Sequence, residues 1–298
     1  MMQRMIRWQE KSELFCFIAS YHAQTTLRKG GDLKKNTLEA ARDFLALGLD
    51  PQKSVFWVQS DVPEVHELAW ILAQSITVPQ LELGHSYKDK VSAGAPPGAG
   101  LFFYPVLMAA DILGFRATSV PVGRDQKQHL EMARDICRRF NNEYGELFIL
   151  PEADIAEDVA LVPGIDGRKM SKSYNNTISV FGTKAEIKKQ VMSITTDSKG
   201  MDEPKSREGP LYEIFQLFLD ESARSKLDRK LGEKGVGYGH LKQDLLSVIE
   251  DHFADCRKRR EALSDADVRA IMAEGATRAR SVIRPVLDEA RAVTGLAY

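Results

Sequence analysis

Three short apolar runs alternate with helical patterns in the first half of the chain, and this alternation constrains the fold more than any other feature. The runs cover residues 14–19, 54–59 and 118–122 and are rich in aromatic or β-branched residues. Such runs are typical of buried parallel strands. Residues 37–49 carry an apolar stripe, and residues 63–75 begin with a proline in the first turn, so both segments are predicted to be crossover helices. The sequence therefore predicts an α/β fold.

The strand signals stop after Gly182, and helical patterns fill the rest of the chain. The expected helices there include residues 211–220, 241–252 and 266–292. The glycine- and proline-rich segment 94–100 is predicted to be a loop. We expect two domains, a parallel-sheet domain at residues 1–182 and a helical domain at 183–298.

Charge gives no support for a general attraction to polyanions. The chain has 41 basic and 42 acidic residues and a net charge of −1, so any nucleic-acid contact must come from local patches. The basic clusters at residues 138–139 and 257–260 are candidates, although such clusters are also typical of solvated helix faces.

Cysteine usage and hydropathy indicate a cytoplasmic protein. Cys16, Cys137 and Cys256 are far apart, lack paired spacing and lie among apolar or helical neighbours, so we interpret them as reduced, buried thiols. No apolar run has the length needed to cross a bilayer, and the first residues contain no signal-peptide core.

The segment Lys169-Met170-Ser171-Lys172-Ser173 is the strongest chemical signal in the chain. Glycines precede it at positions 164 and 167, and Asn175-Asn176 follows it. Two ammonium groups and two hydroxyl groups on a mobile loop are suited to gripping a polyphosphate, because they supply positive charge and hydrogen-bond donors. The alternative is an ordinary solvated polar loop.

A second candidate site lies on one helix face. Tyr104, Met108 and Asp111 are spaced i, i+4, i+7, and Pro105 is expected in the first turn of their helix. A buried, unpaired carboxylate is unfavourable, so Asp111 needs a partner if it faces inward. The spacing alone leaves open the alternative that Asp111 points to the surface.

The segment from Val120 to Gln126 passes from a strand end through a glycine turn into a helix. Such turns at the carboxyl edge of a parallel sheet are where α/β proteins bind ligands. Asp125 fits a helix N-cap, a role that is compatible with a ligand at the same helix start.

Taken together, these segments resemble those of the tryptophanyl-tRNA synthetases, a family of class I aminoacyl-tRNA synthetases. The resemblance covers nearly the whole chain and is carried by residues 21–23, 59–64, 104–113, 121–131, 169–173 and 237–239. The tyrosyl enzymes share the lysine-serine loop but lack the Met-Ala-Ala-Asp segment. The resemblance implies a Rossmann-like catalytic domain whose first strand is missing from this sequence, and a helical domain on the tRNA and anticodon side. It also implies a ligase that joins tryptophan to ATP, releases pyrophosphate and transfers the aminoacyl group to tRNA(Trp).

The resemblance also assigns roles to individual residues. By its motifs, Asp111 matches the acceptor for the indole N–H, and Tyr104 and Gln126 match the residues that hold the amino-acid ammonium and carboxylate. The remaining matches are Met108, Val120 and Val122 for the walls of the indole pocket, His22 for a position beside it, Gly123, Arg124 and Asp125 for the ATP ribose turn, and Lys169, Met170, Ser171, Lys172 and Ser173 for the pyrophosphate loop. Mg²⁺ would be held mainly by the ATP phosphates and water, with no dedicated protein metal site. The family forms homodimers.

The sequence departs from the family in two places. It has no His-Ile-Gly-His-like segment after the first strand of the family, since residues 1–8 match the helix that follows that segment, and Leu83-Gly84-His85 lies too late to replace it. We expect either that translation starts upstream or that the chain is a truncated paralogue that binds without catalysis, and we expect residues 1–298 alone to form little adenylate. Ser20 stands where the family often has Asp. The competing functions are a tyrosine-activating ligase and a non-catalytic synthetase-like binder.

Overall fold

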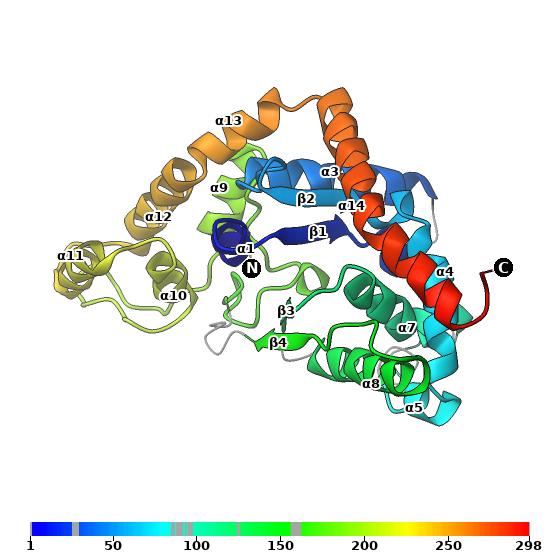
Figure 1. Cartoon of the computed structure of the whole chain (residues 1–298). Coiled ribbons are helices and arrows are strands. Elements are labelled where there is room, and N and C mark those ends of the chain that lie inside the picture. The colour runs from blue at the N-terminus through cyan, green and yellow to red at the C-terminus, as the bar shows by residue number, and fades with distance from the viewer. Residues whose placement is uncertain are drawn as a thin grey trace. The chain divides into compact units, whose positions relative to one another are not determined.

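The chain forms two compact units (Figure 1). The structure is a computed structural model that describes residues 2–297 except 26–29, 85–86, 88–91, 93, 95–97, 124–125 and 156–161. The first unit combines Met1–Glu157 with Arg260–Tyr298, and the second covers Asp158–Arg259. These units differ from the expected boundary between residues 182 and 183 in two ways, because the second unit already begins at Asp158 and the last helix of the chain belongs to the first unit.

The first unit contains two pairs of parallel strands. Strand β1 (Leu14–Ile18) pairs with β2 (Ser54–Val58), and β3 (Ser119–Val122) pairs with β4 (Glu152–Ile155). The α/β class and the three predicted strands are confirmed. Strand β4 was not expected, because its sequence Glu-Ala-Asp-Ile is short, half polar and only partly buried, so it lacks the apolar run of an interior strand. Among the described residues, the two pairs do not share a ladder.

Helices surround these strands. Those of the first unit are α1 (Met2–Gln9), α2 (Ser20–Gln24), α3 (Gly30–Ala46), α4 (Glu64–Leu72), α5 (Val78–Glu82), α7 (Ala99–Leu113), α8 (Lys127–Tyr144) and α14 (Asp265–Val293), with short 3-10 turns at η1 (Gln59–Asp61) and η2 (Ala73–Ser75). The predicted crossover helices correspond to α3 and to α4 with η2. Helix α3 ends before Gly48, whose φ of +112° is a left-handed conformation that glycine adopts without strain.

Strand β2 organises the core of the first unit. Val55 and Trp57 are 2% and 1% exposed and pack in a cluster with apolar residues of α4, α7, α8 and α14. Phe56, on the opposite face of the strand, packs with residues of α3 and with Val268 and Met272 of α14. Helix α14 therefore covers the strand directly, and this long-range packing explains why the chain's end joins the first unit.

The second unit is helical in its described part. It contains a 3-10 turn η4 (Lys172–Tyr174) and helices α9 (Lys184–Met192), α10 (Pro210–Gln216), α11 (Glu221–Gly232) and α12 (Tyr238–His252), and α13 (Ala254–Ala262) leads out of it. Buried Ile187, Val191, Leu241 and Leu245 join α9 and α12 in one apolar cluster. In the portion of the chain that the structure describes, no helix is both long enough and apolar enough to cross a membrane.

Candidate active site

Helix α7 carries the predicted face of Tyr104, Met108 and Asp111. Asp111 is only 7% exposed, whereas Tyr104 and Met108 are half-buried. The alternative of a surface-pointing Asp111 is therefore wrong. The start of the helix also differs from the expectation, because α7 begins at Ala99 and Pro105 lies inside it. Ala99 and Gly100 are thus helical, although the glycine- and proline-rich segment predicted a loop there.

The Asp111 carboxylate has one occupied and one unoccupied oxygen. Its Oδ2 accepts a 2.6 Å hydrogen bond from Nε2 of Gln59. Its Oδ1 is buried and has no hydrogen-bond partner among the residues that the structure describes. Burial raises the pKa of Asp111 well above its usual value, and the Gln59 hydrogen bond offsets part of that increase. An acceptor with a free lone pair in an apolar setting is suited to a ligand N–H donor.

Gln59 is completely buried at the first position after strand β2. Its Oε1 accepts a hydrogen bond from the backbone N–H of Tyr21 at 3.1 Å and lies 3.2 Å from Nδ1 of His22. Gln59 therefore joins the end of β2 to α2 and to the carboxylate of α7. The His22 ring also meets the Tyr104 ring edge to face, with 5.8 Å between ring centres.

A second series of hydrogen-bonding contacts links the side chains of Tyr104, His129 and Gln126. The Tyr104 hydroxyl is 2.7 Å from Nε2 of His129, and Nδ1 of His129 is 3.1 Å from Oε1 of Gln126. His129 is 1% exposed, so the imidazole is enclosed between the two predicted amino-acid-binding residues. The structure thus brings Tyr104 and Gln126 together through a histidine to which the sequence assigned no role.

The strand β3 residues lie on the same core. Val122 is 8% exposed, and Val120 and Met108 are half-buried against the same apolar cluster. Gly123 follows the strand and is half-buried. The predicted ribose-turn residues Arg124 and Asp125 lie outside the described residues, and Gln126 is the N-cap position of α8.

The lysine-serine loop belongs to the second unit. Backbone hydrogen bonds from Met170 to Val162 and from Gly164 to Arg168 form a short hairpin, in which Gly167 has a φ of +82°. The two serine hydroxyls, Ser171 and Ser173, lie 2.8 Å apart. Lys169 and Lys172 are exposed, and their ammonium groups form no hydrogen bond or ion pair with the described residues. The loop therefore presents two cations that are available to an anionic ligand.

The side chain of Asn176 stabilises this loop through hydrogen bonds to its backbone. It is 1% exposed, its Oδ1 accepts a 2.8 Å hydrogen bond from the Ser171 amide, and its Nδ2 donates to the Lys169 carbonyl at 3.1 Å and to Asp166 at 2.7 Å. The hydrogen bonds from Asn176 and from Arg168 lower the pKa of Asp166. Gly164 lies against Asn176 so closely that a Cβ there would be 2.1 Å from Nδ2. The asparagine and glycine flanking the motif are thus part of its framework.

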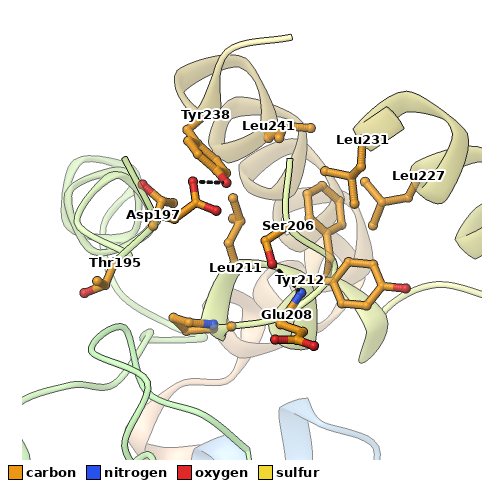
Figure 2. A pocket seen from close by; sticks show the side chains of 14 residues that line it. Thr195, Asp197, Ser206, Glu208, Leu211, Tyr212, Leu227, Leu231, Tyr238 and Leu241 are labelled. Atoms are coloured by element: carbon orange, nitrogen blue, oxygen red, sulfur yellow. Dashed lines mark hydrogen bonds between the residues drawn. The ribbon is translucent and has the colours of Figure 1, made fainter. Parts of the chain in front are cut away.

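The second unit also contains a cavity of about 400 Å³. Leucines and phenylalanine from α10, α11 and α12 form part of its wall, and Thr195, Asp197 and Ser206 supply polar groups (Figure 2). The Tyr238 hydroxyl donates a 2.6 Å hydrogen bond to Asp197, and burial together with this bond raises the pKa of Tyr238 to about 12. None of the residues predicted for the site lines this cavity.

In both basic clusters, arginine side chains have hydrogen-bond or ion-pair partners within the protein. In the first cluster, Arg138 pairs with Asp135 and Arg139 donates to Gln80. In the second cluster, Arg257 donates to the Val180 carbonyl and Arg260 pairs with Glu39 and Asp43.

Cys16 and Cys137 are buried as predicted, but the prediction for Cys256 is wrong, because α13 has no buried residues and this thiol is partly exposed.

Two residues of this arrangement, Gln59 and His129, were given no role from the sequence. Each had a usable signal. Gln59 directly follows a buried strand at the carboxyl edge of a parallel pair, where polar residues are commonly functional. His129 stands three residues after Gln126, so both face the same side of the first turn of α8. Among the described residues, no group of three or more His, Cys, Asp or Glu side chains could hold a metal ion.

Comparison with known proteins places this arrangement in a family. The family described as tRNA synthetases class I (W and Y) matches residues 1–254. Tryptophan–tRNA ligase of Campylobacter jejuni is 49% identical over 99% of this chain and 93% of its own length, and that of Fusobacterium nucleatum is 47% identical over 99% and 92%. A crystal structure of tryptophanyl-tRNA synthetase from Campylobacter jejuni, complexed with ADP and tryptophan, superposes with a TM-score of 0.96 at 48% identity, covering 99% of this chain and 93% of that one. The enzyme from Mycoplasma pneumoniae, at 29% identity, superposes with a TM-score of 0.79 over 99% of this chain and 91% of that one.

Proposed function

The chain belongs to the class I tRNA synthetases of the tryptophan and tyrosine group, and on this premise we propose that it is a tryptophan–tRNA ligase. It activates L-tryptophan with ATP, releases pyrophosphate and transfers the tryptophanyl group to tRNA(Trp). The curated relatives with this activity extend over nearly the whole chain, which supports tryptophan rather than tyrosine as the amino acid.

One observation carries the choice of tryptophan. The Oδ1 atom of Asp111 is a buried acceptor without a partner among the described residues. The indole N–H can only donate a hydrogen bond, so it complements this oxygen. A tyrosine side chain has no ring N–H, and its binding would leave a desolvated acceptor without that donor. The carboxylate therefore favours the larger, N–H-bearing ring.

The neighbouring residues supply the rest of the amino-acid site in this proposal. Met108, Val120 and Val122 form the apolar walls around the indole, and His22 lies beside the ring. Tyr104 and Gln126 hold the ammonium and carboxylate of the substrate. Support for their joint role comes from His129, which contacts both at hydrogen-bonding distance and fixes their side chains relative to each other.

The lysine-serine loop handles the phosphates. Lys169 and Lys172 neutralise the negative charge that builds on the departing pyrophosphate, and Met170, Ser171 and Ser173 complete the loop around it. Gly123, Arg124 and Asp125 form the turn against the ATP ribose. Catalysis is then a matter of positioning and electrostatic stabilisation, with no covalent protein intermediate. Any Mg²⁺ that accompanies ATP would be held mainly by phosphate oxygens and water and would help to neutralise the phosphate charge.

We propose further that the protein is a cytoplasmic homodimer. Support for a subunit interface comes from the first unit, where the large apolar side chains of Trp70, Val78 and Leu83 are 68%, 59% and 61% exposed.

The tRNA partner would use local basic groups, because the net charge of −1 gives no overall attraction to a polyanion.

Replacing Asp111 with Asn tests the proposed specificity. Asn can offer its oxygen to Gln59 only by turning its NH₂ group toward the indole, so a donor would face a donor. We expect tryptophan affinity, measured by calorimetry, to fall by at least about tenfold. Asp135→Asn, which removes an exposed carboxylate on α8, is the matched control. Undiminished tryptophan affinity in Asp111→Asn, or binding of tyrosine by the wild-type protein as tight as that of tryptophan, would contradict the proposal.

A further inference from the structure

We infer that Gln59 is a positioning residue for substrate selection, which occupies one oxygen of Asp111 and thereby reserves the other for the substrate N–H. The inference rests on the proposed tryptophan specificity and names a further residue that determines it. Gln59 itself does not need to touch the substrate. It acts through the carboxylate that does.

The contacts around Gln59 fix the orientation of its side-chain amide. A backbone N–H can only donate, so the atom 3.1 Å from the Tyr21 nitrogen must be the amide oxygen, Oε1. The amide nitrogen, Nε2, then faces Asp111 Oδ2 at 2.6 Å, where a carboxylate oxygen accepts. Each end of the amide thus has one partner of unambiguous character, whereas Nδ1 of His22, 3.1 Å from Nε2 and 3.2 Å from Oε1, does not distinguish the two orientations. A flipped amide would place oxygen against oxygen and N–H against N–H.

Burial makes this arrangement strong. Gln59 is 0% exposed and Asp111 is 7% exposed, so little water competes for either group. With Oδ2 occupied, Oδ1 is the carboxylate atom left to accept from a ligand. Burial raises the pKa of Asp111, and donation from Nε2 opposes this by favouring the ionised carboxylate, which accepts a stronger hydrogen bond than the neutral acid. Loss of Gln59 would free the carboxylate to rotate and would leave both oxygens seeking donors.

A pair of ligands separates this role from a merely structural one. L-Tryptophan carries the indole N–H, whereas its benzothienyl analogue has sulfur in that place and is otherwise similar in shape. In Gln59→Met, we expect tryptophan affinity to fall by about tenfold, as for the loss of a hydrogen bond to a charged group. Affinity for the analogue should change by no more than about twofold, because the analogue does not depend on the reserved oxygen. Isothermal titration calorimetry of the full chain measures both.

Two further variants make the test secure. Gln59→Asn keeps the amide but shortens it by one methylene, so it should give the same selective loss if Gln59→Met folds poorly. Gln9→Met is the matched control, because Gln9 is also a buried glutamine of the first unit, and its hydrogen bonds among the described residues are to Gly48, Asp50 and Ser54. It should lower stability without changing the ratio of the two affinities.

The outcomes are distinct. A selective loss for tryptophan in the Gln59 variants supports the inference. Equal losses for both ligands, or no loss for tryptophan, would overturn it while leaving the proposed function standing. Failure of the wild-type chain to bind tryptophan would instead overturn the proposed function, and this inference with it.

Discussion

Gly275 of helix α14 lies directly on the peptide group of Phe56 in strand β2. A Cβ atom at this glycine would stand 1.8 Å from the Phe56 carbonyl oxygen, a separation that no packing adjustment of side chains can relieve. The close approach allows the helix to cover the strand, with Val268 and Met272 buried on the same side of it.

Replacing Gly275 with Ala should therefore destabilise the first unit. The added methyl group must push helix and strand apart, and we expect the free energy of unfolding to fall by about 3 kcal/mol. Urea denaturation followed by circular dichroism measures the change. Gly100→Ala is the control, since among the described residues no atom outside its own helix backbone and chain neighbours lies within 4 Å of a Cβ built there, so the methyl group should be tolerated. Equal stability of Gly275→Ala and wild type would contradict the observed packing.

The buried carboxyl group of Asp111 predicts a pH-dependent stability. Burial raises its pKa above the usual value, so in the folded state it binds a proton at pH values where the unfolded chain has already released it. The free energy of unfolding contributed by this group therefore falls as pH rises from about 4 through the folded pKa, and is constant above that. Asp111→Asn cannot ionise. Its stability relative to wild type should increase with pH over this window, as measured by urea denaturation at several pH values. A difference independent of pH would argue against a perturbed carboxyl group.

Asn176→Ala should loosen the lysine-serine loop without unfolding the second unit. The asparagine accepts from the Ser171 amide and donates to the Lys169 carbonyl, so its loss removes both attachments. We expect hydrogen exchange at the Ser171 amide to accelerate by about tenfold, the value for one lost hydrogen bond. Mass spectrometry of exchanged peptides detects it. Asn142→Ala, at an exposed position on α8, should leave this peptide unchanged, and unaltered exchange in Asn176→Ala would show that the loop is held by other contacts.

The three cysteines should differ in reactivity toward a thiol reagent. Burial raises the pKa of Cys16 to about 12 and also raises that of Cys137, so neither forms the reactive thiolate readily near neutral pH. Cys256 is partly exposed on α13. We expect one thiol to react rapidly in the native protein, and Cys256→Ser to abolish that phase. Rapid labelling that persists in Cys256→Ser would show that a buried cysteine becomes accessible.

Local sequence signals predicted the parts of the fold that depend on local patterns. The apolar runs correctly indicated β1, β2 and β3, and the i, i+4, i+7 spacing correctly placed Tyr104, Met108 and Asp111 on one helix. Strand β4 was not predicted because its four residues are half polar and only partly buried, so they lack an apolar run. The membership of α14 in the first unit depends on contacts between distant segments, such as Gly275 with Phe56, which no local window contains.

For the candidate site, the sequence likewise indicated some features and missed others. Residue types and motif resemblance indicated a carboxylate, a tyrosine and a cationic loop, and these roles stay predictions. The partners that orient them could not be found in the same way. Gln59 and His129 take their significance from atoms that lie 52 and 25 residues away in the chain, on α7. A glutamine is acceptable at many buried positions, so only its neighbours in space reveal what it does.

The placement of α14 also has a consequence for biosynthesis. The ribosome releases β1 and β2 before the second unit, and α14, which shields one face of β2, emerges only after that whole unit. The face of β2 that α14 covers is therefore incompletely covered while the second unit is synthesised, whereas the second unit has all of its own segments available before α14 emerges. Chaperone dependence during translation is accordingly expected to concentrate on the earliest part of the chain.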